Sequence, residues 1–197
     1  MREAGTGISI ADLAVPPGTG VLYGIRAPAD QLGGQGKLYT INTTTGVATL
    51  VGNTGDFFGS IAFAPDGTLY MSAAGLDPLT DNIINIGLKT LNPANASTLS
   101  FVATPDFFGA LGIRPADGVI FGGTGDLGQI FTINPASGKE TLIGSTGRNF
   151  VGDIDFQVPE PGTLVLLGLG LLGIAGNWLA REQRGGRDQH CDDTGQT

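Results

Sequence analysis

The chain has 197 residues and a formal net charge of −8, with 34 Gly, 11 Pro and a single Cys. The acidic balance excludes the basic face that nucleic-acid binding requires, and one cysteine excludes an internal disulfide framework. Glycine stands far above its usual share of ~7% without a collagen period, which favours short strands joined by tight turns.

The first residues, Met1–Gly7, lack the basic start and apolar run of a secretory signal peptide. An apolar run near the C-terminus, followed by arginines, indicates a chain whose earlier residues are exported, and export requires such a signal peptide. We therefore expect the chain to be truncated at its N-terminus, with a signal peptide encoded upstream of Met1.

Two short patterns recur along the chain, first after 50 residues and then after 42 or 43. One pattern is Asp56–Gly59, which returns as Asp106–Gly109 and Asn149–Gly152, and the other is Leu38–Asn42, which returns as Leu88–Asn92 and Ile130–Asn134. Self-similarity at such a period indicates a repeat architecture.

Each repeat reads as four short strands, expected in the middle unit near 60–64, 68–73, 86–91 and 98–102. The turn Asp66-Gly67 between apolar runs is a strong hairpin signal, because such a turn requires positive φ. The first unit is expected over 8–51 and the third over 110–144, with a lone strand at 152–158 opening a fourth. A four-stranded unit every ~40–50 residues is typical of a β-propeller blade.

The sequence therefore predicts an all-β repeat domain over residues 1–158, a partial β-propeller-like array of about three four-stranded blades. Propellers close with about 4–8 blades, so the count also indicates missing N-terminal blades. An open stack and an assembly between chains remain as alternatives. Phe57, Phe107 and Phe150 occupy one place per repeat, and we expect them to pack between blades.

Asp56 and Asp106 are weak candidates for a metal site, because each precedes the expected innermost strand of the next blade. Together with Asn149, Asp153 and Asp155 they would offer oxygen ligands to a calcium ion. The interpretation that we favour is that each Asp or Asn side chain hydrogen-bonds its own turn, so we expect no metal and no cofactor.

Gly162–Ala180 is a run of 19 residues without a charge, close to the ~20 that a helix needs to cross a bilayer. It contains seven Leu, and Trp178 near its end suits the membrane interface. Three arginines follow, which favour the cytoplasmic side: Arg181, Arg184 and Arg187. We predict one C-terminal transmembrane α-helix over 162–181, followed by a polar tail at 188–197.

The residues just before this span are Val158, Pro159, Glu160 and Pro161. Pro-Glu-Pro, an apolar helix and a basic cluster together resemble the PEP-CTERM sorting signal, also called the ice-binding protein C-terminal domain. The signal proper would span 159–187. The resemblance implies that the chain stays in the inner membrane until an exosortase-type transpeptidase cleaves near Pro-Glu-Pro. It also makes the three arginines the stop-transfer charges.

The resemblance implies a bacterial protein with its repeats outside the membrane, which then reaches the cell surface or is secreted after processing. The repeats resemble exported propellers that precede this signal. We expect a non-catalytic surface or extracellular-matrix protein that binds or scaffolds, with extracellular polysaccharide as its partner. The alternative is an exported propeller enzyme acting on polysaccharide, whose active-site blades are missing. The expected inner strands offer no acid–base pair, and the lone histidine, His190, lies in the tail.

Overall fold

The computed structural model describes residues 8–26, 36–56, 58–77, 79–80, 82–125 and 127–156. The chain divides into two units, Met1–Phe156 and Gln157–Thr197, and all described residues belong to the first. The predicted helix at 162–181, the processing motif and the arginines lie outside the described residues. Within these ranges, no helix is long and apolar enough to cross a membrane.

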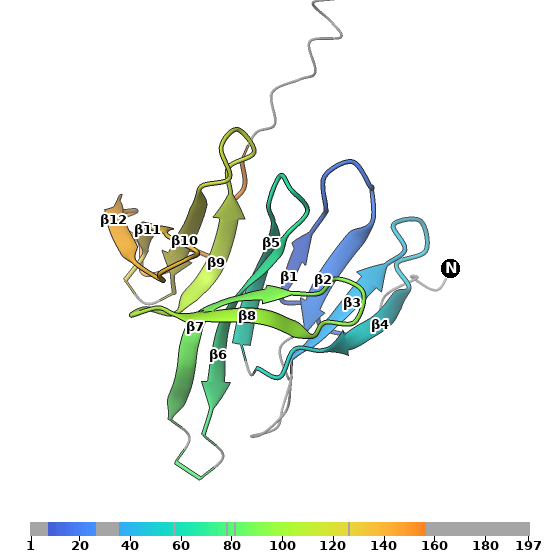
Figure 1. The fold of residues 1–197 in the computed structure, drawn as a ribbon, viewed down its shortest axis with the longest axis horizontal. Helices are drawn as coiled ribbons and strands as arrows, with labels where there is room; N and C mark the ends of the chain where they lie inside the picture. The colour runs from blue at the N-terminus through green and yellow to red at the C-terminus, as the bar shows by residue number, and fades with distance from the viewer. Residues whose placement is uncertain are drawn as a thin grey trace, which may run out of the picture. The chain divides into compact units, whose positions relative to one another are not determined.

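The first unit contains three antiparallel sheets of four strands each, and each sheet is a meander built from one repeat (Figure 1). We call the sheets blades 1, 2 and 3. Blade 1 consists of β1 (Asp12–Ala14), β2 (Leu22–Arg26), β3 (Lys37–Ile41) and β4 (Ala48–Asn53). Blade 2 consists of β5 (Phe58–Phe63), β6 (Leu69–Leu76), β7 (Ile83–Leu91) and β8 (Thr98–Ala103). Blade 3 consists of β9 (Phe108–Ile113), β10 (Ile120–Thr124), β11 (Gln129–Ile133) and β12 (Glu140–Ser145).

The first strand of each blade lies beside the first strand of the next, with β5 between β1 and β9 (Figure 1). We call β1, β5 and β9 the inner strands. The strands β4, β8 and β12 form the opposite edges of the sheets. This arrangement confirms the predicted all-β fold of four-stranded units.

The turn between the third and fourth strands is built alike in every blade. In blade 1 the Asn42 side chain accepts hydrogen bonds from the N–H groups of Thr44 and Thr45, and Gly46 closes the turn at a φ of 70°. This is the left-handed region, which suits glycine because it has no Cβ. The corresponding asparagines are Asn92 and Asn134, and the corresponding left-handed residues are Ala96 and Gly138.

Two hydrophobic clusters hold the blades together. The cluster between blades 1 and 2 contains Ile25, Leu38, Ile61, Leu69, Met71, Ala73, Leu91 and Ala96. The cluster between blades 2 and 3 contains Ala62, Ala64, Leu88, Phe108, Leu111, Ile113, Ile120, Phe131 and Ile133. Every member is buried, so apolar area removed from water is the main force that joins one blade to the next.

The buried aromatic position of the repeat lies one residue later than the sequence suggested. Phe57 lies outside the described residues, and Phe107 is half-buried. Phe150 is 65% exposed, so the prediction that it packs between blades is wrong. Phe108 is 1% exposed instead, and its ring packs edge-on against Phe131 with centroids 5.8 Å apart. Successive side chains of a strand point to opposite faces, so a shift of one residue reverses the face.

The predicted fourth-blade strand at 152–158 is absent from the described part, since residues 151–156 form no strand. Asp153 and Asp155 each accept a hydrogen bond from the amide of the following residue. A strand exists only through ladder hydrogen bonds to a neighbour, and the described residues give this segment no such ladder. The remaining two residues of the prediction lie outside the described ranges.

Candidate functional site

The polar groups that converge in this domain lie on the inner strands. Asp12, Ser60 and Ala110 hold the same place on β1, β5 and β9, because the registers pair them with equivalent residues of the second strands: Ile25, Ser72 and Gly123. Asp153 follows Gly152 as Ser60 follows Gly59, so it is the fourth member of this series.

A chain of hydrogen bonds runs through this place from blade to blade. Asp12 Oδ2 accepts the hydroxyl of Ser60 at 2.6 Å and the amide of Ile61 at 2.7 Å. Ser60 Oγ in turn accepts the amide of Leu111 at 2.9 Å. We call these four residues the inner-strand latch. In each step, a side chain of one blade accepts a backbone amide of the next blade.

Burial and the hydrogen bonds of the latch act in opposite directions on the pKa of Asp12. Burial raises the pKa of this carboxyl above its ordinary value, although hydrogen bonds from Ser60, Ile61 and Leu13 favour the charged form. The negative charge of Asp153 raises it further. Both carboxylate oxygens of Asp12 accept hydrogen bonds, since Leu13 donates its amide to Oδ1 at 2.8 Å. The arrangement therefore serves to join blades.

The latch stops at blade 3, because Ala110 has no side-chain acceptor. The amide of Ile154, which corresponds to those of Ile61 and Leu111, donates instead to Asp153 Oδ1 at 2.7 Å. Sequence reasoning treated Asp153 only as a candidate calcium ligand and missed Asp12 entirely. A comparison of Asp12-Leu-Ala with Asp153-Ile-Asp would have revealed their equivalence.

Asp56, one of the weak metal candidates, forms a buried ion pair. Lys89 Nζ lies 2.7 Å from each of its carboxylate oxygens, and the two side chains are 4% and 14% exposed. Burial raises the pKa of Asp56, and the hydrogen bond and charge of Lys89 oppose that rise. The favoured interpretation, a hydrogen bond within its own turn, is wrong for Asp56. Both oxygens face a lysine, which supplies the positive charge that a metal would.

Asp106 has a different environment, because Phe131 occupies in blade 3 the place that Lys89 holds in blade 2. The amide of Asp106 donates to Glu140 Oε1 at 3.0 Å. Burial raises the pKa of Glu140, and the charge of Asp106 adds to the rise. In the described part of the chain, no group of three or more His, Cys, Asp or Glu side chains is placed to hold a metal ion.

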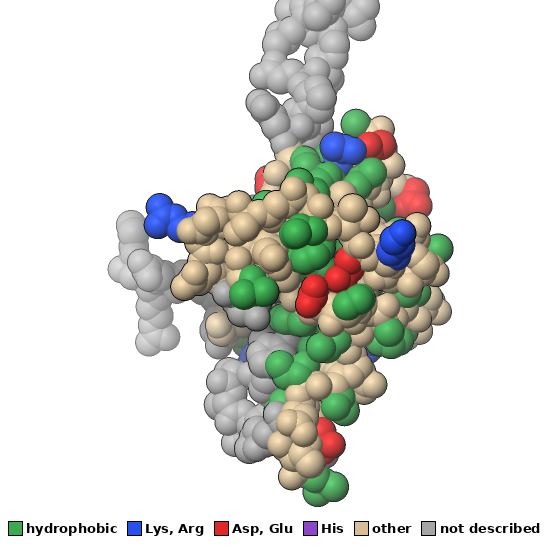
Figure 2. Space-filling view, turned by 90° about the vertical axis from the view of Figure 1, so that its left-hand side faces the viewer, with side chains coloured by type: hydrophobic (Ala, Val, Ile, Leu, Met, Phe, Trp, Pro, Cys, Tyr) green, Lys and Arg blue, Asp and Glu red, His purple; other side chains and the backbone are tan. Residues whose placement is uncertain are grey.

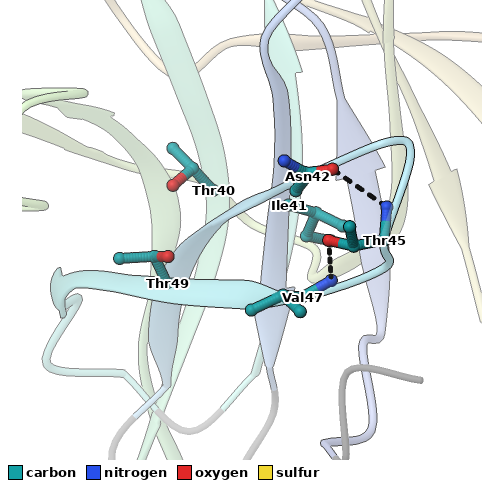
Figure 3. A pocket seen from close by; sticks show the side chains of 6 residues that line it. All are labelled: Thr40, Ile41, Asn42, Thr45, Val47 and Thr49. Carbon is teal, nitrogen blue, oxygen red and sulfur yellow. Dashed lines mark hydrogen bonds between the residues drawn. The ribbon is translucent and has the colours of Figure 1, made fainter. Parts of the chain in front are cut away.

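Two shallow pockets lie at equivalent places on blades 1 and 3. The pocket on blade 1 has a volume of about 500 Å³ and is lined by Thr40, Ile41, Asn42, Thr45, Val47 and Thr49 (Figure 3). The pocket on blade 3 has about 420 Å³ and includes the corresponding Thr132, Ile133, Asn134 and Thr141. Figure 3 shows Asn42 bound to Thr45 and Thr45 bound to Val47, so these polar groups hold the turn.

Three successive four-stranded meanders make a β-propeller-like repeat architecture, and parts of several solved structures are similar to it. The fold is similar to a luciferin-regenerating enzyme, with a TM-score of 0.52 and 13% identity over 75% of this chain and 50% of that chain. It also matches the Dos1 propeller, with a TM-score of 0.45 and 12% identity over 72% of this chain and 35% of that chain. The C-terminal WD40 domain of Sif2 matches with a TM-score of 0.44 and 14% identity, over 71% and 38% of the two chains.

This chain thus spans half or less of the length of the structures that it matches. At these identities the likeness concerns the fold alone. No curated protein matches the sequence.

The C-terminal segment gives the more specific finding. Residues 157–181 match the PEP-CTERM protein-sorting motif, which confirms the resemblance carried by Val158–Pro161 and the apolar run behind it. The chain therefore joins propeller-like blades to a PEP-CTERM sorting signal, and this signal implies an exported protein that an exosortase sorts.

Proposed function

We propose that the chain is an exported bacterial surface or matrix protein whose blades bind or scaffold without catalysing a reaction. The match of residues 157–181 to the sorting motif carries the proposal. The apolar run at 162–181 anchors the chain in the inner membrane, and the arginines that follow stay in the cytoplasm. Cleavage near Val158–Pro161 then releases the repeat domain.

The geometry of the inner strands supports a non-catalytic role. Propeller enzymes need polar side chains free to act on a substrate. The carboxylate of Asp12 and the hydroxyl of Ser60 are both engaged in joining blades. Asp56 is likewise paired with Lys89. These polar groups stabilise the array.

The experiment that tests sorting expresses the chain behind a working signal peptide in a host with an exosortase. Replacing Pro159, Glu160 and Pro161 by Ala removes the recognition element but keeps the apolar run. We expect the parent to be trimmed and released, and the triple variant to stay full-length in the membrane. A control with Pro115→Ala and Pro135→Ala, which lie in turns of blade 3, should be processed like the parent. Equal release of the triple variant would refute the sorting role.

The partner that we propose is the extracellular polysaccharide of the host. Released repeat domain, mixed with polysaccharide from the same strain, should co-sediment with it and should generate no new reducing ends. Co-sedimentation with new reducing ends would favour the enzyme alternative. A domain that stays in the supernatant would refute this partner while leaving the sorting role untouched.

A further inference from the structure

Each blade places two hydroxyl side chains opposite one another on its third and fourth strands. The registers pair Thr40 with Thr49, Thr90 with Ser100, and Thr132 with Thr141. In blade 2 the two hydroxyls bind each other at 2.6 Å. The pairs of blades 1 and 3 form no such hydrogen bond within the described part of the chain, and each pair lines one of the two pockets. These hydroxyls are therefore free to bind a ligand.

The pocket on blade 3 differs from the pocket on blade 1 by a positive charge. Lys139 and Val47 hold the same place, because the carbonyl of each accepts the amide of the asparagine that begins its turn, at 2.9 Å in both blades. Figure 3 shows Val47 at this place in the blade 1 pocket. Lys139 is exposed and forms no ion pair with any residue that the structure describes. Its ammonium group is thus free to bind an anion.

The carboxylate that lines the blade 3 pocket is already neutralised. Asp117 accepts hydrogen bonds from Arg114 Nε at 2.9 Å and from Arg114 Nη2 at 2.6 Å. The amide of Val119 donates to the same carboxylate at 3.2 Å. The hydrogen bond from Arg114 holds the pKa of Asp117 below its ordinary value. Among the residues that line this pocket, Lys139 therefore carries the charge that has no counter-charge.

The blade 3 pocket combines an apolar floor with a polar rim. Ile120 and Ile133 line it and are 1% and 4% exposed, whereas the hydroxyls of Thr132 and Thr141 lie nearer the surface. Its volume of about 420 Å³ lies within the range of ~300–1,000 Å³ that is usual for ligand sites. A sugar ring has the matching build, because it presents C–H groups on its faces and hydroxyls around its edge.

The pocket is compatible with a blade packed on the same face. Tyr23, Thr40 and Thr49 stand in one row across blade 1, and the ring of Tyr23 packs against Phe63 of blade 2 with centroids 5.3 Å apart. Blade 2 thus covers the inner end of this row, and the pocket at its outer end remains open. The blade 3 pocket would likewise remain open beside a following blade.

We propose that the blade 3 pocket binds a carboxylated sugar unit, an inference that rests on the proposed polysaccharide partner and makes that polysaccharide acidic. The ammonium of Lys139 binds the carboxylate as a point charge, and the hydroxyls of Thr132 and Thr141 bind the hydroxyls of the ring. Figure 2 shows the side on which β12 lies in Figure 1, where Lys and Arg side chains stand apart from one another. The chain as a whole has a net charge of −8, so binding depends on this local charge and on salt that screens the rest.

The test titrates the full-length chain in uncharged detergent micelles with two trisaccharides, while threonine methyl signals are followed by NMR spectroscopy. One trisaccharide is cellotriose, and the other is the same molecule with every C6 alcohol oxidised to a carboxylate. We expect the oxidised form to shift the signals of Thr132 and Thr141 to saturation and to leave those of Thr40 and Thr49 in place. Cellotriose should bind about fivefold more weakly, because it lacks the partner of the ammonium group.

Three variants locate the binding group. Lys139→Glu should weaken binding of the oxidised trisaccharide about tenfold, since repulsion replaces attraction. Arg148→Glu is the matched control, because it changes the net charge equally at an exposed residue that does not line the pocket. It should bind like the parent. Val47→Lys should give the blade 1 pocket the same charge, so that the signals of Thr40 and Thr49 also shift.

Several outcomes would overturn the site. They are an absence of shifts at Thr132 and Thr141, equal binding of the two trisaccharides, unchanged binding by Lys139→Glu, and equal weakening by Arg148→Glu. A Val47→Lys variant whose blade 1 signals stay in place would also overturn the role given to the lysine. The polysaccharide partner is judged separately by co-sedimentation. A chain that binds the oxidised trisaccharide at Thr132 but does not sediment with host polysaccharide would keep this site and refute only the proposed partner.

Discussion

Lys89 Nζ lies 2.7 Å from both carboxylate oxygens of Asp56, and this ion pair ties the segment between β4 and β5 to the third strand of blade 2. The Asp56 side chain is only 4% exposed. A buried charge that loses its partner stays desolvated without compensation, which is why breaking such a pair costs far more than the pair itself contributes.

We therefore predict that Lys89→Met destabilises the domain by about 3–5 kcal/mol, because it leaves the Asp56 carboxylate buried and unpaired. The double variant Lys89→Phe with Asp56→Asn should recover most of this loss, since blade 3 already has Phe131 at the corresponding place. Urea unfolding of the two variants and the parent measures the difference. If the double variant is no more stable than Lys89→Met, the unpaired Asp56 carboxylate is not the cause of the destabilisation.

The inner-strand latch makes a second prediction. Asp12→Ala removes the acceptor of the Ser60 hydroxyl and of the Ile61 amide, and should lower the free energy of unfolding by about 1.5–3 kcal/mol. Asp153→Ala is the matched control, because Asp153 accepts only the amide that follows it among the described contacts, at 2.7 Å. It should cost less than ~1 kcal/mol. Equal losses in the two variants would argue against a latch between blades.

The raised pKa of Asp12 predicts how the latch depends on pH. A carboxyl whose pKa is higher in the folded than in the unfolded state binds its proton more tightly when folded, so protonation favours folding. The stability that protonation of Asp12 contributes is fully present below the ordinary pKa of 3.8, and it is lost as the pH rises through the raised pKa of the folded state. The stability of the parent relative to Asp12→Asn should therefore fall as pH increases above 3.8. Thermal unfolding in a pH series checks this, and a difference that rises with pH would contradict it.

The turn of blade 3 yields a fourth prediction. A Cβ on Gly138 would collide with the backbone carbonyl of Ala103, and Gly138 has a φ of 68°. Because a carbonyl in a strand cannot move aside, Gly138→Ala should destabilise the domain by about 1–3 kcal/mol. Gly144→Ala, on an open part of the neighbouring strand, should change stability by less than ~0.5 kcal/mol. Denaturant midpoints that rank the two variants in the opposite order would show that this inter-blade contact is not tight.

The blades themselves could be predicted because their signals are local. The turn Asp66-Gly67, the recurring asparagine turns and the spacing of the apolar runs all act within a few residues of one another. The orientation of the aromatic residues was harder, since Phe107 and Phe108 are adjacent and strand parity decides which one is buried.

The contacts between blades were not predictable from one repeat. Asp12 and Ser60 are 48 residues apart, and neither residue alone indicates a hydrogen bond between them. The ion pair of Lys89 with Asp56 was equally unpredictable, because Tyr39 and Phe131, the residues that correspond to Lys89 in blades 1 and 3, carry no charge. Such pairings depend on how one blade stacks on the next, which the periodicity alone does not specify.

The latch has a direction, since the accepting side chains of Asp12 and Ser60 always belong to the earlier blade and the donated amides to the later one. For a chain that crosses a membrane with its N-terminus leading, this direction coincides with the order of emergence. When a new blade emerges, the acceptor side chain of the preceding blade has already been exported. No blade therefore depends on a later blade for its acceptors. The array can therefore form one blade at a time. Its last contact, between β9 and residues 151–156, has no side-chain acceptor because of Ala110, and it lies closest in sequence to the site of processing.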